Sequence, residues 1–235
     1  MTEKHLSSQF ETDLTDISTE VLLMGGLVEA QVQSAIRALE TFDIAIADDV
    51  IAAEQRVNRQ EIEIDAHCSY IIARRQPTAR DLRLLMAISK TITNLERVGD
   101  EAYKIAKRAK RIIGQVSHST IDFSEVRVSA ALAVEMLHKA LDAFARLDAS
   151  EAAMIGRKDP ALDEEFRGFV RKLMRYMMED PKLISVSLDY LFIAKAIERI
   201  GDHATNIAEF TIYIVKGTDV RHLTQEALEQ EAQKQ

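Results

Sequence analysis

Carboxylates recur at one spacing in two distant stretches of the chain. Glu96 and Asp100 lie four residues apart, and so do Glu198 and Asp202. On a helix this spacing places both side chains on one face, where two like charges cost about 0.2–0.5 kcal/mol unless a cation lies between them. Converging carboxylate oxygens can replace the water around a hard or borderline divalent cation. The pattern therefore predicts cation binding in both stretches.

Both pairs belong to a repeated phrase. "ERVGDEAYKIA", which starts at Glu96, returns as "ERIGDHATNIA" from Glu198, with identity at seven of eleven positions. Each copy holds a glycine, Gly99 or Gly201, although glycine within a helix costs about 0.8–1 kcal/mol relative to alanine. Close approach of a neighbouring helix, or of a bound ion, would offset this cost. Upstream segments match as well, so the sequence predicts a duplication.

Each repeat carries a second pair of oxygen-bearing side chains upstream, at the same spacing. These are Glu54 with Asn58 and Asp159 with Asp163. If the helices that carry them face the repeated phrase, four such side chains meet in each half. The predicted metal ligands are Glu54, Glu96 and Asp100 in the first half and Asp159, Asp163, Glu198 and Asp202 in the second. We expect the second half, which offers more carboxylates, to bind metal more strongly.

Neighbouring side chains modify this prediction. Lys104 stands where the second half has Asn206, and a lysine there could neutralise the first cluster without a metal ion. Asp159 precedes Pro160 and is therefore also a candidate helix cap. His203 directly follows the last carboxylate of the phrase and should point away from the acidic stripe. We expect it not to be a ligand.

A simpler interpretation of the phrase stays open. Arg97 with Glu101 and Asp100 with Lys104 could form ion pairs along an ordinary solvated helix face. A plain helical scaffold would then need no metal ion.

The main alternative function is a di-metal carboxylate enzyme, in which helices of a bundle hold two metal ions. Such enzymes combine Glu and Asp with a Glu-x-x-His pair. Glu135 and His138 have this spacing, but the corresponding first-half residues, Ala30 and Gln33, supply neither ligand.

The elements that position these residues are predicted to be helices. Only 8 Gly and 3 Pro interrupt 235 residues, and apolar residues recur at three- and four-residue spacing, as in Leu82, Leu85 and Met86. The predicted helices span residues 8–45, 47–75, 78–115, 120–148, 151–179 and 181–216. Short connections favour antiparallel neighbours. The predicted fold class is all-α, with two tandem, internally repeated three-helix bundles.

The predicted domain boundaries follow from this order of helices. The first bundle covers residues 8–115 and the second covers 120–216, with a linker within 114–120. Residues 217–235 are a polar tail that we expect to be frayed.

Charge and composition exclude several classes of protein. The formal net charge of −8 argues against nucleic-acid binding, which requires a cationic face. The single cysteine, Cys68, cannot form an internal disulfide and indicates a reducing compartment. The chain shows no signal peptide and no apolar run of about 18 residues. We therefore expect a soluble, cytoplasmic protein that meets a membrane only through partners.

The repeated phrases, together with "MGGLVEAQV" and "IARRQPTARDLR", resemble the PhoU family from about residue 10 to residue 216. The resemblance implies a non-enzymatic negative regulator of the phosphate-starvation response. It also implies a homodimer whose partners are the ATPase subunit of the phosphate-specific ABC transporter and a sensor histidine kinase. Family members bind divalent or multinuclear metal ions through E/DxxxD motifs, with Mg, Mn, Fe and Zn as candidates. Asn58 departs from that acidic pattern.

Overall fold

A computed structural model describes residues 8–115 and 121–234 of the chain. Most of the predicted linker, residues 116–120, therefore lies outside the described residues. The helices are α1 (Ser8–Thr41), α2 (Ile44–Arg75), α3 (Ala79–Ile113), α4 (Ser124–Arg146), α5 (Ala149–Ile155), α6 (Asp159–Glu179), α7 (Ile184–Lys216) and α8 (Gln225–Gln233). Two short 3-10 segments, Gly156–Lys158 and Pro181–Leu183, precede α6 and α7. The described residues contain no strand.

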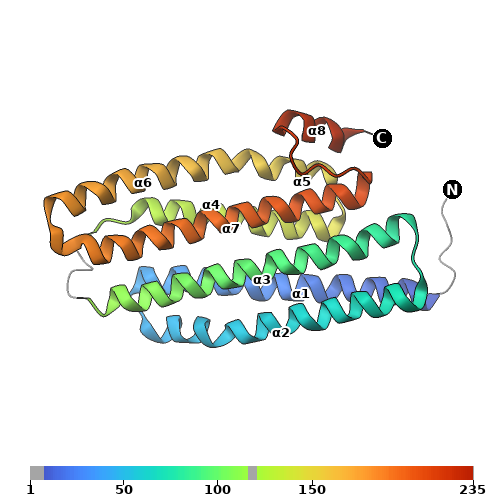
Figure 1. The fold of residues 1–235 in the computed structure, drawn as a ribbon, viewed down its shortest axis with the longest axis horizontal. Coiled ribbons are helices and arrows are strands. Elements are labelled where there is room, and N and C mark those ends of the chain that lie inside the picture. The colour runs from blue at the N-terminus through green and yellow to red at the C-terminus, as the bar shows by residue number, and fades with distance from the viewer. Residues whose placement is uncertain (1–7, 116–120, 235) are drawn as a thin grey trace.

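The helices form two up-down-up bundles that lie side by side (Figure 1). Helices α1, α2 and α3 make the first bundle, and α4, α5 with α6, and α7 make the second. Helix α3 runs along α7 in the opposite direction and forms the most extensive helix–helix contact of the structure. Helices α1 and α4 also meet across the junction. The predicted fold class, all-α with two repeated three-helix bundles, is confirmed.

The first helix ends before the predicted residue 45, because the next helix is capped at Asp43. Helix α1 stops at Thr41, and Phe42 adopts a positive φ of 52°. The side chain of Asp43 then accepts a hydrogen bond from the backbone N–H of Ala45 at 2.8 Å and so begins α2. A capping aspartate satisfies N–H groups that have no partner inside the new helix.

The helix predicted at 151–179 is divided in the structure. Residues Gly156–Lys158 form a 3-10 turn between α5 and α6. Pro160 has no N–H to donate to the Gly156 carbonyl four residues earlier. The Asp159 N–H donates to that carbonyl instead, with the tighter 3-10 spacing. The proline therefore shifts the local hydrogen-bond pattern just where Asp159 enters the acidic cluster.

The polar tail is partly ordered, against our expectation. Helix α8 packs on α5 and buries Leu228 and Ala232, which lie four residues apart on one face. Arg157 Nε donates to Glu229 Oε1 at 2.6 Å, and the Gln225 side-chain amide donates to the Ala153 carbonyl at 2.7 Å. Two small apolar contacts and a few polar ones hold this short helix, which is why composition alone suggested a frayed end.

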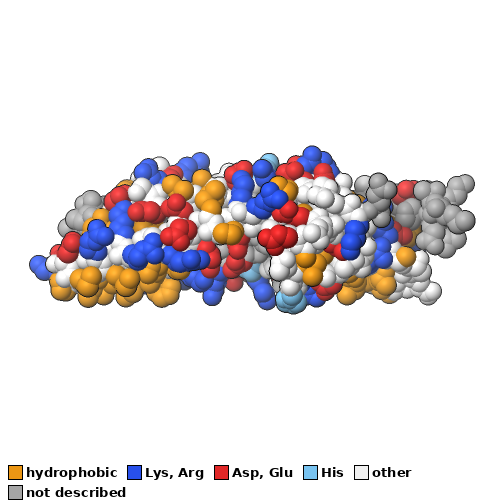
Figure 2. Space-filling model, turned by 90° about the horizontal axis from the view of Figure 1, so that it is seen from above, with side chains coloured by type: hydrophobic (Ala, Val, Ile, Leu, Met, Phe, Trp, Pro, Cys, Tyr) orange, Lys and Arg blue, Asp and Glu red, His pale blue; other side chains and the backbone are white. Residues whose placement is uncertain are grey.

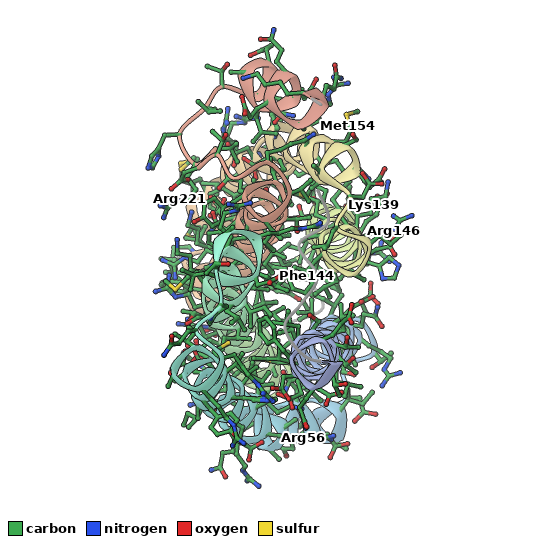
Figure 3. All side chains as sticks on the ribbon, turned by 90° about the vertical axis from the view of Figure 1, so that its right-hand side faces the viewer. Arg56, Lys139, Phe144, Arg146, Met154 and Arg221 are labelled. Carbon is green, nitrogen blue, oxygen red and sulfur yellow. The ribbon has the colours of Figure 1, made fainter. Side chains whose placement is uncertain are left out.

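The core runs through both bundles and across their junction. Along α4, Phe144 points into the interior, whereas Lys139 and Arg146 point outward (Figure 3). A buried ion pair also links the bundles, since Asp189 of α7 is only 1% exposed and accepts a hydrogen bond from Arg108 of α3 at 2.8 Å. A buried charge needs such a partner, because burial removes its hydration.

The repeated glycines allow neighbouring helices to approach closely. A methyl group at Gly99 would lie 3.3 Å from Val57 Cγ1 of α2. At Gly201 it would overlap Leu162 of α6, which is fully buried. By contrast, no atom lies within 4 Å of the space that a methyl group would fill at Gly26. Close helix packing thus offsets the cost of both repeated glycines.

Alanine substitutions should distinguish a glycine that packs closely against a neighbouring helix from one that does not. We expect Gly201→Ala to lower the free energy of unfolding by about 1–2 kcal/mol, because overpacking against Leu162 exceeds the gain in helix propensity. The matched control Gly26→Ala should raise it by about 0.5–1 kcal/mol. Urea unfolding of both variants measures the difference. A stabilising Gly201→Ala would contradict the packing explanation.

Candidate functional site

The second half gathers its four predicted ligands from two helices. Asp159 and Asp163 lie one turn apart at the start of α6, and Glu198 and Asp202 lie one turn apart in α7. Asp159 has helical backbone angles, φ −56° and ψ −46°, so it is not the extended cap that was the alternative. Helices α6 and α7 pack against each other along their lengths. The fold therefore brings both acidic pairs to one place.

These carboxylates lie close enough to repel one another. Partial burial, followed by repulsion from Glu198 and Asp159, raises the pKa of Asp202 to about 6. Burial and the charges of Asp163 and Glu198 raise the pKa of Asp159 as well. The cluster is therefore under electrostatic strain when all of its members are ionised.

Among the described residues, two flexible side chains at the rim, Lys195 and Arg167, offset part of this repulsion. Lys195 Nζ lies 2.6 Å from Glu198 Oε2, and Arg167 Nη2 lies 3.0 Å from Asp163 Oδ2. Each pair forms within one helix turn. The Arg167–Asp163 pair is exposed and contributes little to stability, whereas Glu198 is mostly buried beside an exposed Lys195. Two cations against four carboxylates leave the cluster with a net negative charge.

The first-half cluster is assembled differently from the prediction. Burial and the charges of Asp100 and Glu61 raise the pKa of Glu96. Glu61 lies two turns beyond Glu54 on α2, and it is the α2 carboxylate that acts most strongly on Glu96. Sequence reasoning missed Glu61, although the seven-residue step from Glu54 keeps it on the same helix face. Glu54 is half-buried and lies seven residues before Glu61 and four before Asn58 on α2.

Basic side chains already offset part of the first cluster. Arg97 and Lys104 both act to lower the pKa of Glu96. The predicted surface pairs were Arg97 with Glu101 and Asp100 with Lys104. In the structure Glu101 is instead bound by Lys104 at 3.0 Å and by Arg199 of the other repeat at 3.4 Å. Glu101 is nearly fully buried, so this contact ties α3 to α7.

Two amide oxygens lie beside the first cluster without a hydrogen-bond partner in the described residues. They belong to Gln31 of α1, which is 5% exposed, and to Asn58 of α2. Gln31 Oε1 would lie 3.4 Å from a methyl group at Gly99. The neutral amide of Asn58 makes the first half less acidic than the second, which has Asp163 at the corresponding position.

A pocket of about 400 Å³ lies where the two repeated phrases meet. Its lining residues are Arg97, Asp100, Glu101 and Lys104 of α3 and Arg199, Asp202 and His203 of α7. His203 Nδ1 lies 3.0 Å from Asn94 Oδ1. Burial and the nearby charge of Arg97 lower the pKa of His203 to about 4. The imidazole is therefore neutral at physiological pH and faces the pocket beside Asp202.

The two acidic clusters differ in how well they suit a metal ion. In residues 8–115 and 121–234, no three or more Asp, Glu, His or Cys side chains are arranged to hold a metal ion. The chemistry of the second-half set nevertheless fits a divalent cation, since its acids raise one another's pKa. The first-half set fits less well, because Arg97 and Lys104 already compensate Glu96.

The Glu-x-x-His pair of the enzyme alternative is engaged elsewhere. Glu135 forms ion pairs with Lys139 and Lys158. His138 lies at the surface, 3.3 Å from Glu29 of α1. Neither side chain joins the acidic clusters. No helix in the described part of the chain has the length and apolarity needed to cross a bilayer.

The shifted Asp202 predicts a stability that depends on pH. Its pKa rises from 3.8 to about 6 on folding, so the folded protein binds more protons between these values and loses stability as pH rises through them. In metal-free buffer, Asp202→Asn should therefore stabilise the protein above pH 6. Solvent screening of this exposed side chain limits the gain to about 1 kcal/mol.

Thermal unfolding at pH 4 and at pH 8 tests this prediction. The gain should appear at pH 8 and vanish at pH 4. Asp142→Asn is the control, because Asp142 forms a surface ion pair with Arg146 at 2.5 Å and lies away from the cluster. An equal gain at both pH values would contradict the proposed repulsion.

Comparisons with known proteins agree with this architecture. The PhoU domain matches twice, at residues 21–109 and 126–211, which confirms the duplication. A Burkholderia sp protein named phosphate-specific transport system accessory protein PhoU homolog is 56% identical and covers 99% of both chains. The Escherichia coli (strain K12) protein named phosphate-specific transport system accessory protein PhoU is 49% identical over 94% of this chain and 90% of its own.

Solved structures give the same result. The crystal structure of PhoU from Pseudomonas aeruginosa has a TM-score of 0.86 at 44% identity, and covers 89% of this chain and 100% of its own. The crystal structure of the phosphate transport system regulatory protein PhoU from Streptococcus pneumoniae has a TM-score of 0.82 at 27% identity, and covers 90% of this chain and 99% of its own. With two copies of the family domain, close relatives over nearly the full chain and the same fold, this chain belongs to the PhoU family.

Proposed function

We propose that this protein is a cytoplasmic negative regulator of the phosphate-starvation response and acts as an adaptor without catalysis. The observation that carries the proposal is its similarity, along almost the whole chain, to proteins named phosphate-specific transport system accessory protein. These names support a role in the regulation of phosphate transport. Two similar bundles in one chain also suit an adaptor, because each bundle offers its own helical surface to a partner.

The partners in this proposal are the ATPase subunit of the phosphate-specific ABC transporter and a membrane sensor histidine kinase. When phosphate is plentiful, the adaptor prevents the kinase from activating the response. The name shared by the relatives supports association with the transporter. The proposal also includes a contact with the kinase and a homodimeric assembly.

We further propose that the second-half cluster binds a metal ion. Asp159, Asp163, Glu198 and Asp202 would hold it, and the first-half residues Glu54, Glu61, Glu96 and Asp100 would form a weaker site. The cation, a divalent ion or a multinuclear cluster of Mg, Mn, Fe or Zn, would neutralise repelling carboxylates. Its contribution is charge compensation between α6 and α7.

Paired variants should rank the two clusters. Glu198→Gln with Asp202→Asn should remove more bound metal than Glu96→Gln with Asp100→Asn, because the second half has Asp163 where the first has Asn58 and Asn206 where the first has Lys104. Inductively coupled plasma mass spectrometry of protein purified without an affinity resin measures the metal content. Equal loss in both variants, or a metal-free wild type, would count against the proposal.

Deletion of the gene tests the regulatory role. Loss of a brake should release the pathway, so alkaline phosphatase should rise severalfold in cells grown with ample phosphate. The rise should disappear when the sensor kinase or its response regulator is also deleted. A deletion strain whose phosphatase stays at the wild-type level in high phosphate would rule out this role.

A further inference from the structure

The repeated glycines allow the interiors of the two bundles to be compared at one equivalent point. Gln31 of α1 and Met136 of α4 occupy corresponding positions in the repeat. A methyl group at Gly99 would lie 3.4 Å from the amide oxygen of Gln31. A methyl group at Gly201 would lie 3.7 Å from the sulfur of Met136. The first half thus places an oxygen where the second half places a thioether.

The side chain of Gln31 is buried without full compensation. Gln31 is 5% exposed, and its amide oxygen has no hydrogen-bond partner in the described part of the chain. The amide oxygen of Asn58 on α2 is also buried and also lacks a partner among the described residues. An unpaired buried acceptor destabilises the folded state. Two of them in one bundle call for a donor or a cation.

Both oxygens belong to the inner side of the first acidic cluster. Helices α1, α2 and α3 all pack against one another. Gln31 lies against α3 at Gly99, between the two acids of the repeated phrase. Asn58 lies three residues before Glu61, an α2 acid close enough for its charge to act on Glu96. The amides are therefore the buried wall of a site whose acids are half-exposed.

The carboxylates of this cluster do not complete a metal site by themselves. Within residues 8–115 and 121–234, no three Asp, Glu, His or Cys side chains are arranged to hold a metal ion. Hard cations accept the amide oxygens of Asn and Gln together with carboxylates. Such neutral oxygens raise the number of ligands without adding to the repulsion between acids. With Gln31, all three helices of the bundle contribute to the ligand set.

Ion pairing of the kind seen at the surface does not account for these amides. Figure 2, viewed from the side of α6 and α8, shows Asp and Glu side chains interspersed with Lys and Arg along the molecule. The basic side chains that act on the first cluster, Arg97 and Lys104, line the pocket between α3 and α7. Lys104 is also bound to Glu101. A divalent cation from solution suits the buried oxygens better than either side chain.

We propose that Gln31 and Asn58 are additional oxygen ligands of the first-half site, which thereby takes a hard divalent cation such as Ca²⁺ or Mn²⁺. The acids of α2 and α3 supply the negative charge, and the amides supply neutral oxygens on the buried side. In the second half the thioether of Met136 replaces the Gln31 oxygen, and hard cations bind thioethers weakly. The inference rests on the metal binding proposed above and adds ligands that lie outside its acidic motifs.

The first half can be measured alone in a background variant whose second cluster is neutral. This background carries Asp159→Asn, Asp163→Asn, Glu198→Gln and Asp202→Asn in the full-length protein. Mn²⁺ is the probe, because electron paramagnetic resonance of the free ion gives the amount bound and the dissociation constant. We expect the background to bind Mn²⁺ and Ca²⁺ to displace it. A background that binds no Mn²⁺, while the wild type does, would overturn this inference and leave the second-half site standing.

Substitutions of the amides then test their role as ligands. Gln31→Met, which copies the second half, should weaken Mn²⁺ binding by the background about tenfold or more. Gln31→Glu keeps an oxygen and should bind Mn²⁺ at least as tightly, as should Asn58→Asp. The control is Gln33→Met, because Gln33 is exposed on the same helix and donates to Glu29 at 3.2 Å. It should leave the dissociation constant unchanged. An unchanged constant in Gln31→Met would overturn the proposal.

Stability without metal separates a ligand from a packing residue. In chelator, Gln31→Met should melt at the same temperature as the background or higher, because it removes an unpaired buried oxygen. Added Mn²⁺ should raise the melting temperature of the background and not that of Gln31→Met. A lower melting temperature in chelator, with the Mn²⁺ effect intact, would assign Gln31 to packing and overturn the proposal. A wild type that binds no divalent cation would remove the proposed metal binding and this inference with it.

Discussion

The packing of α3 against α7 is the contact on which the rest of the structure depends. These two helices carry the repeated phrases, and their opposite directions relate one bundle to the other. Two buried acids fasten the contact, Asp189 through Arg108 and Glu101 through Arg199. Each of these helices also packs closely against a second helix of its own bundle, α3 against α2 at Gly99 and α7 against α6 at Gly201. The acidic clusters and the central pocket follow from this single arrangement.

The acidic clusters are costly to the folded protein. Natural domains are stable by only about 5–15 kcal/mol, so repelling carboxylates consume a noticeable part of that margin. Asp202 and Asp159 both have a raised pKa, which means that folding opposes their ionisation. A chain that needed only a packed bundle would gain from asparagine at either position. Binding of a cation is the physical reason we give for keeping the acids.

Much of this architecture could be predicted from the sequence, because repetition and helical periodicity are local signals. The duplication, the helices and the meeting of Asp159 and Asp163 with Glu198 and Asp202 were all accessible in this way. Glu61 was missed, since the repeat drew attention to the aligned position Glu54. Both acids share one face of α2, and the position of α2 along α3 decides which of them acts on Glu96.

Other features depend on tertiary contacts that a pattern does not contain. The buried pair of Asp189 and Arg108 has no counterpart in the first repeat, where the aligned residue is Ala87. Helix α8 is held by the contact of Arg157 with Glu229, some seventy residues apart in the chain. The metal site and the partners stay predictions, since the sequence and the fold show which groups are available and not what binds them.

The proposed regulatory role and the proposed cation site meet in one further proposal, that the second acidic cluster is kept for regulation and not for the stability of the bundle. The most direct measurement is complementation of the deletion strain with the variant that carries Asp159→Asn, Asp163→Asn, Glu198→Gln and Asp202→Asn. Alkaline phosphatase is assayed in high phosphate, with protein level checked by immunoblot and melting temperature checked on purified protein. The account predicts a variant at least as stable as the wild type that leaves phosphatase high. Full repression by the variant would contradict it.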